Sequence, residues 1–237
     1  MPLFEELAAE QTPAGRISLR RRFEPAKGTD VLEVKLDDEY LMSSLFTVAE
    51  VELARLGLAA ADGASLDVVV GGLGLGCTAR AALEDERVAE LAIVEALQPV
   101  ITWHEQGLLT ESAGLNGDDR TRYVLGDFFA MAAGDGFDPE VPRRQWDAVL
   151  LDVDHSPRHT LQPSHAAFYE EAGLRALANH LVPNGVFALW SDDPPDDEFL
   201  TVLQTVFPGA EAHVVAFPNF YTGTDATNTI YVGKRGP

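Results

Sequence analysis

The sequence has few of the residues on which several protein classes depend. Its single cysteine, Cys77, excludes an internal disulfide framework and a four-thiolate metal site. No run of about 18 apolar residues exists, which excludes a membrane-spanning helix. Residues 1–6 lack the basic and then apolar pattern of a signal peptide. These absences predict a cytoplasmic protein that does not interact with a membrane.

Basic residues are also scarce. The chain has 17 Lys and Arg against 38 Asp and Glu, which gives a formal net charge of −21 at pH 7. Such a chain repels phosphate backbones, and the short run Arg20-Arg21-Arg22 does not reverse this, so nucleic-acid binding is excluded. Two interpretations of the acidity stay open: a solvated, mutually repelling surface, or acidic walls that attract a cationic substrate.

From residue 66 onward, short buried strands alternate with helices, which is typical of a parallel sheet. We expect strands at residues 66–70, 91–94, 122–125, 146–151, 185–190, 210–217 and 227–232, and helices at 77–83, 99–108, 165–180 and 199–207. The last two strands have no helix between them, which predicts one antiparallel strand. The expected fold class is α/β, with a doubly wound, mostly parallel seven-stranded Rossmann-like sheet covered by helices on both faces.

The first 60 residues follow another pattern. Apolar residues alternate with polar ones at residues 16–20 and 32–36, which predicts a small β-hairpin. Residues 41–56 have apolar positions at helical spacing, and Gly57 is the expected end of that helix. We therefore expect an N-terminal hairpin and helix extension at 1–60 and a ligand-binding domain at 61–237.

The first strand of the expected sheet ends in a glycine-rich loop, residues 71–76. In open α/β sheets ligands bind beyond the carboxyl ends of the strands, where glycines allow closer approach than a Cβ permits. The residues expected to contact the ligand there are Gly72, Leu73, Gly74 and Gly76. Glu95 ends the next strand, where a carboxylate accepts hydrogen bonds from ribose hydroxyls. The alternative is a structural turn beside a surface glutamate.

The glycine spacing favours a nucleoside over a dinucleotide. A dinucleotide loop reads G-x-G-x-x-G, but counting from Gly72 puts Cys77 at the third glycine position. After the third strand, Asp127 can accept from an adenine amino group and Phe128 can stack on the ring. The alternative for Asp127 is a helix N-cap. Together these residues predict an S-adenosyl ligand.

The loop after the fourth strand is the candidate catalytic segment. An amine nucleophile must lose a proton, and Asp152 or His155 can accept it, with Asp154 orienting His155. His155, His159 and Asp154 also suggest metal ligands, but Pro157 interrupts a helical ligand face, so no metal is expected. A solvated polar loop is the alternative.

Two further groups of polar residues complete the set. Asp192 and Asp193 follow the fifth strand and either bind a cationic substrate or form a solvated loop. His165 and His180 are expected on a helix surface, and Trp103-His104 under the edge of the sheet.

These motifs resemble class I S-adenosylmethionine-dependent transferases. The resemblance is carried by residues 71–76, Val94-Glu95, Gly126-Asp127 and 146–152, and is extended by Phe168-Tyr169 and 181–187. Over residues 31–233 the chain is more narrowly similar to the polyamine aminopropyltransferases, the spermidine synthases.

The resemblance implies a role for each matching carboxylate. Glu95 would bind the ribose, Asp127 the adenine, and Asp152 would deprotonate an attacking amine. It also implies S-adenosylmethionine or its decarboxylated form as donor, a small and cationic amine as acceptor, and a homodimer.

The chain departs from the spermidine synthase pattern twice. The family's glycine loop usually carries an aspartate that holds the donor's amino group, where this chain has Gly74-Leu75. The family's Asp-x-x-Asp-Pro is here residues 152–157, DVDHSP, one residue longer. Three functions therefore stay open: a spermidine synthase-like transferase moving an aminopropyl group to an amine, a small-molecule methyltransferase, and a non-catalytic nucleoside-binding protein.

Overall fold

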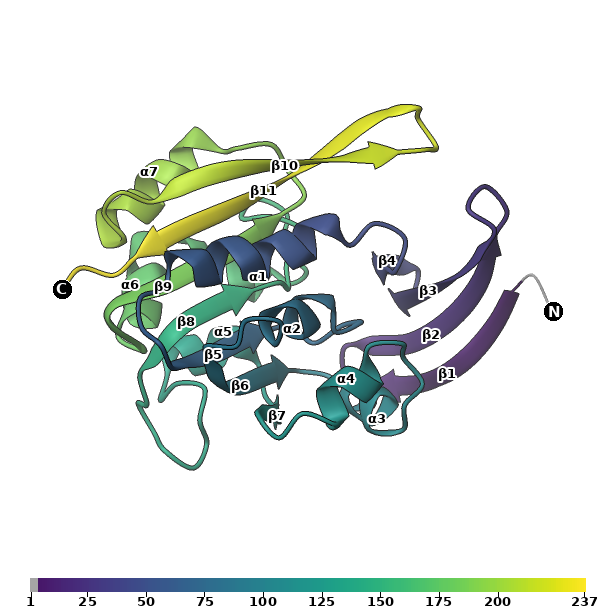
Figure 1. Ribbon diagram of the computed structural model, residues 1–237, viewed down its shortest axis with the longest axis horizontal. Coiled ribbons are helices and arrows are strands. Elements are labelled where there is room, and N and C mark those ends of the chain that lie inside the picture. Colours follow the sequence, from purple (N-terminus) through teal and green to yellow (C-terminus); the bar gives the residue numbers. More distant parts are fainter. Residues whose placement is uncertain (1–3) are drawn as a thin grey trace.

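The computed structural model describes residues 4–237 and shows two β-sheets side by side (Figure 1). Residues 1–3, which belong to the segment used above to exclude a signal peptide, lie outside the described residues. The larger sheet has seven strands in the order β10-β11-β9-β8-β5-β6-β7. Its strands are β5 (Leu66–Gly71), β6 (Val88–Glu95), β7 (Thr121–Leu125), β8 (Trp146–Leu151), β9 (Leu181–Ser191), β10 (Glu211–Asn219) and β11 (Thr224–Lys234).

The strand directions confirm the predicted mostly parallel sheet. Strands β5 to β9 pair in parallel, and β11 runs antiparallel to both β9 and β10. The chain proceeds outward from β5 through β6 to β7 and then returns to β8 on the other side of β5. This reversal is a topological switch point, the kind of place where ligands of open α/β sheets bind.

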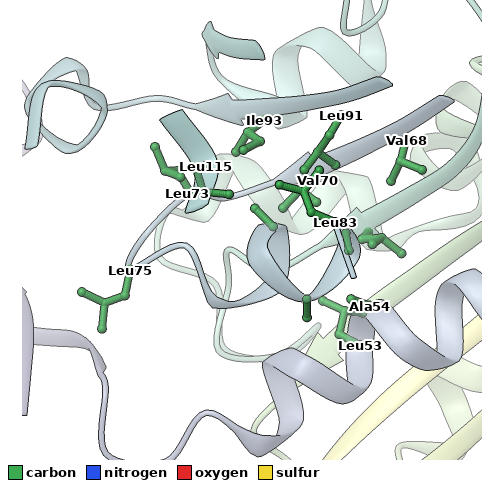
Figure 2. Close-up of a cluster of buried hydrophobic side chains, with 14 of the residues drawn as sticks. Leu53, Ala54, Val68, Val70, Leu73, Leu75, Leu83, Leu91, Ile93 and Leu115 are labelled. Atoms are coloured by element: carbon green, nitrogen blue, oxygen red, sulfur yellow. The ribbon is translucent and has the colours of Figure 1, made fainter. Parts of the chain in front are cut away.

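Helices cover both faces of this sheet, as predicted for a doubly wound fold. They are α1 (Val48–Ala60), α2 (Cys77–Ala82), α3 (Gln98–Glu105), α4 (Ser112–Asn116), α5 (Phe128–Ala133), the 3₁₀ helix η1 (Pro163–Tyr169), α6 (Glu171–Ala178) and α7 (Asp197–Val206). Successive residues of β5 face opposite sides: Val68 and Val70 pack with Leu53 of α1 (Figure 2), whereas Val69 packs in the cluster that contains Leu174 of α6. The sheet therefore separates two apolar cores.

Gly57 lies inside α1 and does not end it, contrary to the prediction. A Cβ at Gly57 would come 2.5 Å from Leu150 Cδ2 and 3.1 Å from Ala188 Cβ. The glycine thus lets α1 approach strands β8 and β9 closely, and this tertiary contact outweighs its poor helix propensity. The helix continues to Ala60.

The long helix predicted for 165–180 is also wrong. Glu170 has an extended backbone (φ −87°, ψ 163°), which separates η1 from α6. The two histidines expected on its surface are buried: His165 is 7% exposed and His180 is 4% exposed. His180 Nε2 lies 3.2 Å from the Ala132 carbonyl oxygen, whereas Nδ1 of the same ring is buried without a hydrogen-bond partner.

The N-terminal extension is a four-stranded antiparallel sheet rather than a hairpin. Strands β2 (Gly15–Glu24) and β3 (Thr29–Leu36) correspond to the predicted hairpin, and β1 (Phe4–Thr12) and β4 (Glu39–Ser43) flank them. The register of β1 shifts between Glu6 and Ala8, which disrupts the period-two pattern that would identify it as a strand. Residues 41–43, predicted as helix, pair instead with β3.

The N-terminal sheet packs on the larger sheet's apolar core through Ile17, Leu19 and Val34. Its arginine run is neutralised by ion pairs: Arg20 and Arg22 with Glu33, and Arg21 with Glu5. Within the described part of the chain, no helix is long and apolar enough to cross a membrane.

The β10–β11 hairpin extends past the larger sheet toward the N-terminal sheet (Figure 1). At its tip the Tyr221 hydroxyl donates to the Glu24 carboxylate, and the Lys27 ammonium lies 4.6 Å from the centre of the Phe220 ring. Phe46, which precedes α1, packs 5.4 Å from the same ring, centre to centre. These contacts join the two sheets at a second place.

Candidate active site at the switch point

The glycine loop after β5 adopts backbone angles that only glycine takes readily. Gly72, Gly74 and Gly76 have φ values of +94°, +46° and +88°. A Cβ at Gly72 would lie 2.1 Å from the Asp152 carbonyl oxygen, so the loop is pressed against the start of the segment after β8. Leu73 and Leu75 alternate with the glycines and are 3% and 6% exposed. The leucines anchor the loop, and the glycines let neighbouring groups of the protein approach its backbone more closely than a Cβ would permit.

Glu95, at the end of β6, is bonded to this loop. Its Oε2 accepts from the Leu73 N–H at 3.1 Å and its Oε1 from the Leu97 N–H at 2.8 Å. Burial raises the pKa of Glu95 above its ordinary value, although these N–H groups act in the opposite direction. A carboxylate has about four lone-pair positions, so Glu95 can still accept from a ligand hydroxyl.

Asp127 and Phe128 begin α5 after β7. Asp127 Oδ1 accepts from the N–H groups of Phe129 at 2.9 Å and Ala130 at 3.2 Å, which makes it the N-cap of the helix. The ring of Phe128 is 3% exposed and stacks on Phe137 at 4.8 Å between centres. The expected stacking of Phe128 on an adenine does not fit this placement, because protein already covers the ring.

Phe128 is buried because of its position against β5. A Cβ at Gly71 would come 2.5 Å from Phe128 Cδ2, so the ring occupies the space that a side chain at Gly71 would need. Phe128 therefore forms the floor beneath the start of the glycine loop.

Asp152 follows β8 directly beside the glycine loop. Its N–H donates to the Gly71 carbonyl at 2.8 Å, and its Oδ2 accepts from the Thr78 hydroxyl at 2.7 Å. Burial raises the pKa of Asp152 to about 6, partly offset by the Thr78 hydrogen bond. At neutral pH this carboxyl group is mainly ionised and is a stronger base than an ordinary aspartate.

Glu50, in the first turn of α1, is a site residue that the sequence did not reveal. Its carbonyl oxygen lies 3.3 Å from the same Thr78 hydroxyl, which places α1 beside Asp152. Burial and, to a smaller extent, the charges of Asp152 and Asp192 together raise the pKa of Glu50 to about 8. Two neighbouring carboxyl groups shielded from water do not both ionise readily. Glu50 therefore keeps its proton at neutral pH while Asp152 is charged.

Asp154 holds the loop after β8 and does not orient His155, contrary to the expectation. It is 1% exposed and accepts hydrogen bonds at 2.8 Å each from the Leu161 N–H, the His165 ring and the Tyr169 hydroxyl. His155 instead faces the N-terminal sheet, with Nε2 3.6 Å from Glu39 Oε1.

The two aspartates after β9 diverge. The Asp192 N–H donates to the His155 carbonyl at 2.7 Å, and the Asp192 charge contributes to the raised pKa of Glu50. Asp193 Oδ2 lies 2.8 Å from His159 Nδ1, and hydrogen bonds from Ser156 and His159 lower the pKa of Asp193. Asp192 thus belongs with the Glu50–Asp152 pair, whereas Asp193 pairs with a loop histidine.

The side chains around Asp152 and Glu50 determine which chemistry this site can carry out. In residues 4–237, no three His, Cys, Asp or Glu side chains are grouped so that they could hold a metal ion. Burial raises the pKa of Cys77 to about 12, so its thiol stays neutral beside the carboxyl groups. The arrangement offers a base, a protonated acid and an additional negative charge beside the glycine loop.

We expect the Glu50→Gln variant to be more stable than the wild type at pH 8, by roughly 4 kcal/mol, and nearly equal to it at pH 4. The pKa of Glu50 is about 8 in the folded chain against an ordinary 4.5, so the unfolded chain releases this proton first as the pH rises. The wild type therefore loses stability between these two pH values. Urea unfolding across this range measures the difference.

The control is Glu52→Gln in the same helix, at a residue that pairs with Arg55. Loss of this surface ion pair should change the free energy of unfolding by less than about 1 kcal/mol. A stability difference for Glu50→Gln that stays constant from pH 4 to pH 8 would show that Glu50 titrates normally.

Solved structures provide the comparison for this fold. No family model matches the chain, and no curated protein matches it in sequence. The crystal structure of spermidine synthase from Thermotoga maritima is similar, with a TM-score of 0.71 at 17% identity over 98% of this chain and 72% of that one. A spermidine synthase in complex with the transition-state analogue AdoDATO has a TM-score of 0.71 at 18% identity, with the same coverage.

A third structure is a probable spermidine synthase from Corynebacterium glutamicum, with a TM-score of 0.66 at 15% identity, covering 99% of this chain and 81% of that one. The likeness extends over nearly the whole chain and includes the N-terminal sheet. At these identities it shows that the chain has the spermidine synthase fold.

Proposed function

We propose that the chain is a transferase that moves an alkyl group, in the first instance an aminopropyl group, from an S-adenosyl-type donor to an amine. The observation that carries the proposal is the Glu50–Asp152 pair beside the glycine loop, at the switch point of a spermidine synthase-like fold. Ligands of such sheets bind at this point. A carboxylate with a raised pKa is suited to general-base work near neutral pH.

The donor would be held by groups after β5, β6 and β7. Glu95 would accept from the ribose hydroxyls and Asp127 from the adenine amino group, while the backbone of the glycine loop would pack along the nucleoside. Because these strands lie in the order β7-β6-β5, a nucleoside bound in this way would have its 5′ end over β5, next to Asp152.

The acceptor would enter as an ammonium ion attracted by Asp152 and Asp192. Asp152 takes one proton, and the free amine attacks the carbon bonded to the donor's sulfonium. A C–N bond forms as the C–S bond breaks, the electron pair moves to sulfur, and the sulfonium becomes a neutral thioether. Holding the two reactants in line would provide much of the acceleration. The product amine keeps its positive charge, so one proton in total remains on Asp152.

Calorimetric titration tests the donor site. We expect binding of S-adenosylmethionine, its decarboxylated form or methylthioadenosine, weakened about tenfold or more by Glu95→Ala and by Asp127→Ala. Glu105→Ala, at an exposed glutamate that ends α3, should bind like the wild type. Binding of none of the three compounds would contradict the proposal, and unchanged binding by both variants would mean that other residues form the site.

A methyltransferase acting on a small molecule is the second candidate. It is favoured by Gly74, because the loop has no side chain at this position that could hold a donor's amino group. Turnover with S-adenosylmethionine but not with its decarboxylated form would select it. Binding without turnover of either donor would select a non-catalytic nucleoside-binding protein. The homodimer stays a prediction.

A further inference from the structure

Met42 of the N-terminal sheet lies directly on the glycine loop. It pairs with Val34 in the β3–β4 register, so its side chain shares the face that packs toward the larger sheet. Met42 Sδ accepts a hydrogen bond from the Leu75 N–H at 3.1 Å. A Cβ at Gly74 would come 2.3 Å from Met42 Cε and 2.4 Å from Sδ. The thioether therefore fills the space that the missing side chain of Gly74 leaves.

Among the hydrogen bonds described for the N–H groups of the loop, the one from Leu75 to Met42 has the weakest acceptor. Gly72 N–H donates to the Val94 carbonyl at 2.9 Å, and Gly76 N–H to the Leu73 carbonyl at 2.7 Å. Leu75 N–H donates to a thioether sulfur, a weak acceptor on a flexible side chain. The Leu75 N–H can thus be transferred to a ligand at lower cost than the N–H groups of Gly72 and Gly76, or that of Leu73, which donates to the Glu95 carboxylate at 3.1 Å.

Leu75 lies where the loop meets the N-terminal sheet. Figure 2 shows Leu73 beside Leu115, whereas Leu75 lies farther out along the loop, away from Val68 and Val70. A ligand whose ribose lies on Glu95 directs its 5′ substituent along β5 and over Gly74. A substituent longer than a methylthio group meets the Met42 side chain there.

We propose that Met42 is a specificity-determining residue: it competes with the donor's 5′ tail for the space above Gly74 and for the Leu75 N–H. It weakens binding of a nucleoside with a long tail relative to one with a short thioether substituent. The inference rests on the proposed function, because it takes the nucleoside to lie on Glu95 and Asp127. It adds that the tail displaces Met42 when the donor binds, and that Met42 returns when the tail has been transferred.

Calorimetry of Met42→Ala with two nucleosides tests this competition. We expect the Kd of S-adenosylmethionine to fall about tenfold and that of methylthioadenosine to change less than about twofold, because only the former reaches Met42. Met42→Leu keeps the bulk and should retain the wild-type ratio of the two Kd values to within about threefold. Leu41→Ala, on the same strand, should also retain that ratio.

The outcomes separate the two proposals. If both nucleosides bind the wild type and Met42→Ala leaves their Kd ratio unchanged, Met42 does not sense the tail, although the nucleoside site stands. If neither nucleoside binds the wild type or Met42→Ala, the proposed function itself is wrong. Urea unfolding of Met42→Ala verifies that the protein titrated is folded, and a ratio changed equally by Leu41→Ala would count against a specific role for Met42.

Discussion

Replacing Asp152 with asparagine is expected to lower turnover by roughly 10²–10⁴-fold, the usual contribution of a general base. The amide keeps the size of the side chain and can still accept from the Thr78 hydroxyl, but it cannot take a proton from the amine. The measurement is the release of methylthioadenosine from decarboxylated S-adenosylmethionine with a diamine as acceptor. Nucleoside affinity, measured by calorimetry, should change little.

Two comparisons test whether the lower turnover comes from loss of the general base. In the wild type, kcat/KM should rise with pH through about 6, because Asp152 accepts a proton only when ionised, and Asp152→Asn should lose this rise. Asp193→Asn removes a charge from the next loop, where the carboxylate pairs with His159, and should reduce turnover less than about threefold. An Asp152→Asn variant that keeps full turnover would remove Asp152 as the base.

The second large effect concerns the fold itself. We expect Gly72→Ala to lower the free energy of unfolding by about 2–5 kcal/mol. Part of this loss is backbone strain, since an alanine at φ +94° costs about 1–2 kcal/mol. The rest comes from overpacking, typically about 1–3 kcal/mol, because the new Cβ would lie 2.1 Å from the Asp152 carbonyl oxygen. Urea unfolding measures the sum.

Gly107→Ala is the matched control, because it introduces backbone strain without a steric clash. Its φ is +70°, and a Cβ there would have nothing within 4 Å. Gly107→Ala should therefore cost about 1–2 kcal/mol. If both variants lose equal stability, the close approach of the glycine loop to Asp152 does not contribute, and the loop is looser than its geometry indicates.

Sequence patterns predicted the larger sheet well because the residue types in each strand favour a strand, and the residues that follow favour its end. The run Leu66 to Val70 contains three consecutive β-branched valines and is followed at once by glycines, so adjacent residues indicate both the strand and its end. Gly57 shows the limit of such signals. A glycine in a helical pattern suggests an end, and only the contact of α1 with Leu150 reveals that it is a packing position.

The positions of the candidate site residues were also predicted only where local sequence patterns determine them. Residues placed by strand ends, such as Glu95 and Asp152, could be located from the pattern of the sheet. Glu50 could not, because a glutamate in the first turn of an amphipathic helix is ordinary on a surface, and its burial against Asp152 depends on how α1 packs. The prediction for Asp154 was wrong because it relied on the neighbour in sequence, His155. The hydrogen-bond partners of Asp154 instead come from residues 161–169.

The hydrogen bond between Tyr221 and Glu24 joins residues 197 positions apart. During synthesis on the ribosome, the N-terminal sheet emerges long before the hairpin that fastens it. Burial of its inner residues Ile17 and Leu19 needs the apolar core of the larger sheet. The contacts of Tyr221 and Phe220 with Glu24 and Lys27 can form only after most of the polypeptide has been made, whereas the partners of Met42 lie within residues 34–75.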